Sequence, residues 1–181
     1  MTRLGLLTLI LVLIAALPSA DAADRRAAAR GAACLSRAVG PGGDGQAADT
    51  ALALRAAGRL PAGERRARAR ALARGTRSYA RTAGSIGKVM LGMAALGSNP
   101  RCVGGVDLRR ALARTDRGGR YGRSTYDHAL AMLGLRAIGV RPRPVAVRVL
   151  LRARGRGGWG FALRAGGRDD ASATGRVARC R

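Results

Sequence analysis

Three stretches decide the fold: ADTALALRAAGRLP at 48–61, GKVMLGMAALGSNP at 87–100 and YDHALAMLGLRAIGVRP at 126–142. Each is an apolar helical segment that ends near a glycine and is followed shortly by a proline. The three glycines, Gly58, Gly97 and Gly139, are spaced 39 and 42 residues apart, so the period is about 40 residues. A period of this length, with two helices in each unit, predicts helical hairpins that stack on their neighbours.

Apolar residues within these stretches recur at helical spacing, since Leu130, Leu133 and Ala137 fall at i, i+3 and i+7. Ser124, three residues before Asp127, resembles the start of a capping box. The three period-marking glycines are expected just past the ends of helices. Helices are predicted over residues 25–39, 48–57, 62–80, 85–96, 106–115, 125–138, 144–153 and 170–178.

The composition favours an all-α fold with small residues at the helix contacts. The chain has 181 residues, 27 of them glycine, and although 48% of the residues are hydrophobic, only 3% are aromatic. A core of alanine, leucine and valine suits close helix–helix packing better than a β-sandwich. The length is that of a single domain.

The net charge is +24, and arginine supplies it almost alone, because Lys88 is the one lysine among 34 basic residues. The arginines are spread along the whole chain, and GC-rich codons could produce such a bias. No nucleic-acid recognition motif accompanies them, so no specific nucleic-acid partner is predicted. Nonspecific, salt-dependent attraction to anionic surfaces is still expected.

The N-terminus has the pattern of a secretory signal peptide over residues 1–22. Arg3 precedes an apolar run at 4–17, which Pro18 ends and which is too short for a comfortable membrane span. The preferred cleavage point follows Ala22, the second choice follows Ala20, and an uncleaved anchor is the alternative. The chain is therefore expected to be secreted or associated with the cell envelope.

Export makes one disulfide plausible among three cysteines, Cys34, Cys102 and Cys180, and leaves one thiol over. The spacing does not indicate which two pair. Cys180, the penultimate residue, could instead pair between chains.

The glycine-rich turns resemble a known family repeat. GGWGF at 157–161, followed by Asp169, Asp170, Ser172 and Thr174, is similar to the repeat of the terpenoid cyclase and protein prenyltransferase superfamily, also called the prenyltransferase/squalene oxidase repeat. Similar passages are GGDGQAADTALAL at 42–54, NPRCVGGVDLRRAL at 99–112 and GGRYGRSTYDHALAMLGL at 118–135. The resemblance covers most of residues 30–175 and implies αα-hairpin repeats over 23–181 that form a partial α/α toroid.

The chain departs from that family in two respects. Arg152, Arg154 and Arg156 lie where the repeat usually has a glutamine. The seven or eight predicted helices are fewer than the dozen or so of a complete toroid, so an open arc would expose two repeat edges. Either the open edges mediate self-association, or the chain is a truncated gene product, and truncation is the preferred interpretation.

The acids that a protonating cyclase of this superfamily needs, in the pattern Asp-x-Asp-Asp, are absent. Asp169–Asp170 is the only acidic pair, and residue 167 is glycine. Asp170 is better explained as a helix N-cap, and Asp49 and Asp127 as acids near helix starts.

A zinc site of the prenyltransferase kind is not predicted either. His128 is the single histidine, and its neighbour Asp127 points about 100° away on a helix, so the two do not readily share a metal. No catalytic residue, metal or cofactor is therefore assigned.

The family resemblance places candidate ligand-binding residues at the mouth of the toroid. They are Tyr121, Tyr126, Asp127, His128, Trp159, Phe161 and Asp170. The alternative for Trp159 and Phe161 is a structural role, in which they pack between the helix layers and fix the turn.

Three functions remain open. The first is a non-catalytic exported repeat protein that binds an apolar or amphipathic ligand or a protein partner. The second is a divergent or truncated terpene cyclase- or prenyltransferase-type enzyme, for which turnover of an isoprenoid should require Asp169 and Asp170. The third is a basic envelope-associated protein, whose binding should vanish at high salt.

Overall fold

Helices dominate residues 20–164, which are the residues that the computed structural model describes. The helices in this range are α2 (Ala20–Ala38), α3 (Gly45–Ala56), α4 (Ala62–Tyr79), α5 (Ala83–Ala95), α6 (Leu108–Ala113), α7 (Thr125–Ala137) and α8 (Pro144–Arg152). The predicted all-α class is confirmed at this level, and seven of the eight expected helices are present. The expected helix at 170–178 lies outside the described residues, as do 1–19 of the expected signal peptide.

Two short antiparallel hairpins, which were not predicted from the sequence, flank α6. They are β1 (Cys102–Val103) with β2 (Val106–Asp107), and β3 (Asp116–Arg117) with β4 (Arg120–Tyr121). The expected helix start at residue 106 is therefore wrong, because residues 106–107 are strand. Each hairpin turns on a Gly-Gly pair with φ between 56° and 91°, the left-handed region that a tight two-residue turn needs.

Polar side chains cap the starts of α3, α5, α6 and α7. Asp44 accepts a hydrogen bond from the Ala47 N–H, so α3 begins three residues earlier than expected. The interpretation of Asp49 as an acid near the start of its helix is consequently wrong. Ser124 accepts from the Asp127 N–H at 2.9 Å and caps α7 as predicted.

The three period-marking glycines end α3, α5 and α7 in the same way. Gly58, Gly97 and Gly139 have φ of 66°, 65° and 76° and lie just past their helices, as predicted. Each donates its N–H to the carbonyl three residues back, and the following residue donates to the carbonyl five back. This pair of bonds is the Schellman motif, which glycine favours because it lacks a Cβ.

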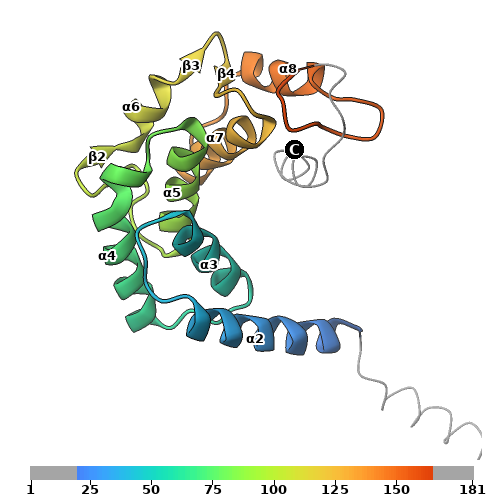
Figure 1. Ribbon diagram of the computed structural model, residues 1–181. Coiled ribbons are helices and arrows are strands. Elements are labelled where there is room, and N and C mark those ends of the chain that lie inside the picture. The colour runs from blue at the N-terminus through green and yellow to red at the C-terminus, as the bar shows by residue number, and fades with distance from the viewer. Residues whose placement is uncertain (1–19, 165–181) are drawn as a thin grey trace, which may run out of the picture.

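Helices α3, α5 and α7 lie side by side, although a helix intervenes between each pair in the sequence. Figure 1 shows them along the inner side of an open arc, with α4 and α6 on its outer side. Small residues let them approach closely. A Cβ on Gly92 would lie 2.9 Å from the Ala48 Cβ, and one on Gly134 would lie 2.7 Å from the Gly87 Cα.

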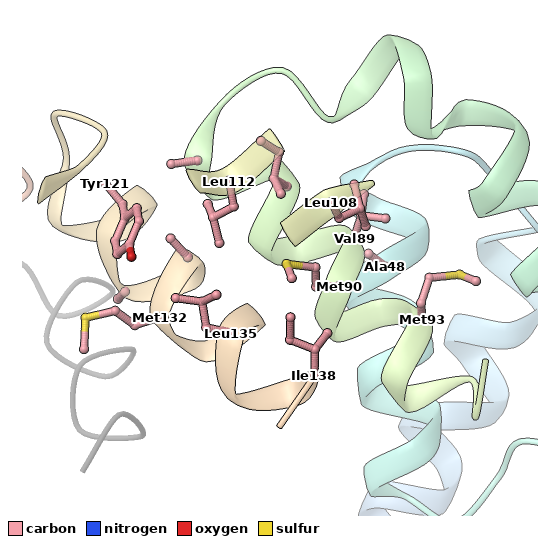
Figure 2. Packing of buried hydrophobic residues seen from close by; sticks show 14 of the residues in the cluster. Ala48, Val89, Met90, Met93, Leu108, Leu112, Tyr121, Met132, Leu135 and Ile138 are labelled. Atoms are coloured by element: carbon pink, nitrogen blue, oxygen red, sulfur yellow. The ribbon is translucent and has the colours of Figure 1, made fainter. Parts of the chain in front are cut away.

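The core lies between these helices and α6. Figure 2 shows Met90 of α5 among Leu112, Leu135 and Ile138, with Leu108 of α6 beside α5. These side chains are aliphatic and buried, as the composition predicts. Helices α3, α5 and α7 are therefore held together by close approach of their backbones and by an interior filled with methionine and leucine side chains.

Candidate functional site

His128 is a buried residue whose ring is hydrogen-bonded to backbone groups on both sides. Its side chain is 0% exposed, its Nδ1 accepts from the Tyr121 N–H at 3.0 Å, and its Nε2 lies 2.9 Å from the Ala146 carbonyl oxygen. A backbone N–H can only donate, so Nδ1 carries no proton and Nε2 donates to Ala146. Burial lowers the pKa of His128, and the ring stays neutral at physiological pH. His128 thereby joins α7 to β4 and α8.

Two of the predicted aromatic residues serve the same junction. Tyr121 is buried, with its ring centroid 5.7 Å from that of His128. Trp159 is also buried, and its Nε1 donates to the Leu150 carbonyl at 2.8 Å. This bond holds the segment that follows α8 against that helix. This arrangement fits the packing role considered for Trp159. The same role for Phe161 is wrong, because its side chain is 66% exposed.

The remaining predicted residues are dispersed. Tyr126 and Asp127 are half-buried at the start of α7, and Asp127 packs against Gly84 of α5, where a Cβ would lie 3.1 Å from its Cα. Asp170 lies outside the described residues. Of the six described candidates, three lie at the buried junction around His128, two lie at the α5–α7 contact, and Phe161 is exposed, so they are not gathered at one place.

A polar network around Lys88, which was not predicted from the sequence, spans α3, α5 and α7. Lys88 Nζ donates to Asp49 Oδ2 at 2.8 Å and lies 5.7 Å from the centroid of the Tyr126 ring. Burial alone lowers the pKa of Lys88, but hydrogen bonds to Asp49 and Tyr126 outweigh it, and the net shift is upward. The ammonium is therefore a charged structural group and a poor nucleophile.

Unequal burial of this ion pair gives a testable asymmetry. The Lys88 side chain is 11% exposed and the Asp49 side chain 49%. Asp49→Ala should lower the free energy of unfolding by about 1.5 kcal/mol, because it leaves a buried ammonium without its carboxylate. Lys88→Met, which keeps the apolar stem and leaves a hydrated carboxylate, should cost less than about 1 kcal/mol.

Urea unfolding of both variants measures this difference. The double variant should be no less stable than Asp49→Ala, because removing Lys88 also removes the uncompensated charge. A larger loss for Lys88→Met than for Asp49→Ala would contradict the assignment.

A groove of about 400 Å³ opens between α7 and α8. It is lined by Met132, Arg136, Arg141, Pro142, Pro144, Val147 and Arg148. Its apolar surface comes from one methionine, one valine and two prolines, and three arginines supply its cationic groups. None of the six predicted site residues that the structure describes lines it. The RPRP run at 141–144 supplies part of the groove and was visible in the sequence. The sequence does not indicate, however, in which direction α8 packs against α7.

Metal sites, free thiols and membrane spans were also considered for the described residues. Within residues 20–164, no three His, Cys, Asp or Glu side chains lie close enough to hold a metal ion. Cys34 and Cys102 are exposed, and both carry free thiols in the structure. A search of the same residues found no helix with the length and apolarity needed to cross a membrane.

Comparison of the chain with protein-family models, with curated proteins and with solved structures found no match.

Proposed function

We propose that this chain is an exported, non-catalytic helical-repeat protein that binds an amphipathic ligand in the groove between α7 and α8. The groove carries the proposal. Its apolar lining suits a hydrocarbon portion, and its three arginines suit a polar or anionic end.

A partial α/α toroid is the arrangement proposed for the repeats. Two observations support it: α3, α5 and α7 lie next to one another, and all three end in the same hydrogen-bonded glycine motif. In such an arrangement the α7–α8 groove would lie where two neighbouring repeat units meet.

The groove contains an apolar side chain that the fold leaves accessible. Val147 is 38% exposed, although it follows Ala146, which is fully buried, on the same helix. Covering Val147 with a ligand alkyl chain would remove apolar surface from water. Arg148, its neighbour, lines the groove beside it, so one helix turn supplies both halves of an amphipathic site.

The test is a titration with a fluorescent long-chain fatty acid. Val147→Asn should weaken binding by roughly tenfold, because it replaces apolar contact area with a polar group. Leu35→Asn is the matched control, since Leu35 on α2 is 36% exposed and lies outside the groove. Equal affinity of the two variants, or no saturable binding to the parent chain, would refute the proposal.

Salt distinguishes this function from association through charge alone. Fatty-acid binding in the groove should persist at high salt, because its main contribution is apolar. Loss of binding at high salt would instead support a basic protein that associates with anionic surfaces. The net charge of +24 favours that alternative. Turnover of an isoprenoid substrate would overturn the non-catalytic assignment.

A further inference from the structure

A second cavity, of about 370 Å³, lies on another face of α8. It is lined by Arg117, Gly118, Arg120, Val149, Arg152, Ala153, Leu163 and Arg164. Val149, Arg152 and Ala153 fall at i, i+3 and i+4, which puts them on one side of the helix. The α7–α8 groove uses Pro144, Val147 and Arg148, so among residues 20–164 the two cavities share no lining residue.

Four arginines from distant parts of the chain converge on this cavity. Arg117 and Arg120 come from the β3–β4 hairpin, Arg152 from the end of α8, and Arg164 from the segment after it. Within residues 20–164, none of the four forms an ion pair, whereas Arg68 and Arg143 each have a carboxylate partner. All four side chains are exposed, so solvent screens their charges in part, but four like charges around one cavity still favour an anion bound among them.

The hairpin arginines are held in place before any ligand binds. Arg120 donates to the Leu163 carbonyl, and Arg117 Nη1 donates to the Arg114 carbonyl at 3.2 Å. The turn between them is fixed as well, because Asp116 Oδ1 accepts from the Gly119 N–H at 2.6 Å. Guanidinium groups that are already oriented lose less conformational entropy when they bind an anion.

We propose that this cavity binds a phosphate monoester group. Guanidinium forks match phosphate oxygens in geometry, and a dianion uses several cations at once. Val149, Ala153 and Leu163 provide an apolar wall against which the organic part of the ligand can rest. This site is independent of the α7–α8 groove.

The experiment compares two variants that lose the same charge. Arg152→Gln with Arg164→Gln removes two cavity arginines, and Arg109→Gln with Arg110→Gln removes two exposed arginines of α6 that do not line the cavity. Calorimetric titration with glycerol phosphate should show affinity lowered at least about tenfold in the cavity variant, the scale of one lost charge-assisted hydrogen bond. The α6 variant should stay within about twofold of the parent chain.

A second arm uses vesicles of phosphatidic acid diluted in phosphatidylcholine, which present the same group on a lipid. A loss specific to the cavity variant with either probe supports the site, and the probe bound more tightly identifies the source. Equal losses in both variants, or no binding of either probe to the parent chain, would overturn it. Circular dichroism verifies the fold of each variant, and Val147→Asn should leave glycerol phosphate binding unchanged, which separates this test from the groove test.

Discussion

Gly87→Ala is expected to lower the free energy of unfolding by about 3 kcal/mol, although alanine is the better helix former. Gly87 lies where α5 meets α7. A Cβ there would lie 2.5 Å from the carbonyl carbon of Leu130 and 2.8 Å from the Ala131 nitrogen. Both atoms belong to the backbone of a helix, so no side-chain rotation relieves the overlap. The two helices would have to separate, and the buried contacts between them would loosen. Urea unfolding followed by circular dichroism measures the loss.

Gly31→Ala is the matched control. Gly31 lies inside α2, where no atom comes within 4 Å of an added Cβ. The substitution should raise the stability of α2 slightly, by up to about 1 kcal/mol, through helix propensity alone. If Gly87→Ala behaved like Gly31→Ala, the close α5–α7 contact would be wrong.

This contact shows how much of the fold was predictable from the sequence. Helical periodicity and the spacing of Gly58, Gly97 and Gly139 predicted the helices to within three residues at most ends, because those signals are local. The composition also predicted close packing between small residues. The sequence pattern does not indicate which helices pack against each other. Nothing in the sequence therefore distinguished Gly87 from the other glycines.

The hairpins were missed for a different reason. Each strand has only two residues, too few for a period-2 pattern to be visible beside the helical one. The Gly-Gly pairs in CVGGVD at 102–107 and DRGGRY at 116–121 were a usable signal, since two consecutive glycines favour a tight hairpin turn.

The polar network could have been found by superposing the repeats. Asp49 and Lys88 are 39 residues apart, the same separation as Gly58 and Gly97, so they occupy equivalent positions on neighbouring helices. A carboxylate and the only lysine at matching positions predict an ion pair between repeats. The two cavities, in contrast, depend on how α8 packs, and no local pattern specifies that.

His128→Ala should lower the free energy of unfolding by about 4 kcal/mol. The substitution removes both hydrogen bonds of the ring and leaves the Tyr121 N–H and the Ala146 carbonyl unpaired in the interior. Each orphaned buried group costs about 1–3 kcal/mol, and the space left by the imidazole adds a cavity penalty. Thermal and urea unfolding measure the effect. A loss below about 1 kcal/mol would show that His128 does not join α7 to β4 and α8.

The pH dependence of the parent chain tests the same junction without a substitution. His128 is the only histidine, and burial, together with the nearby Arg120, lowers its pKa, while the hydrogen bond to the Ala146 carbonyl and the charge of Asp116 oppose that shift. Below about pH 6.5 the unfolded chain therefore takes up a proton that the folded chain excludes. The free energy of unfolding should fall by up to about 1.4 kcal/mol as the pH falls from 7.5 to 5.5. Ordinary carboxylates titrate below this pH interval and therefore contribute little to the change. In His128→Gln this dependence should disappear.

A proton NMR titration of the parent chain, in which the imidazole signal belongs to one residue, should place the midpoint of the His128 titration below pH 6.5. A midpoint at or above that value would contradict a buried ring whose neutral form is favoured in the folded protein.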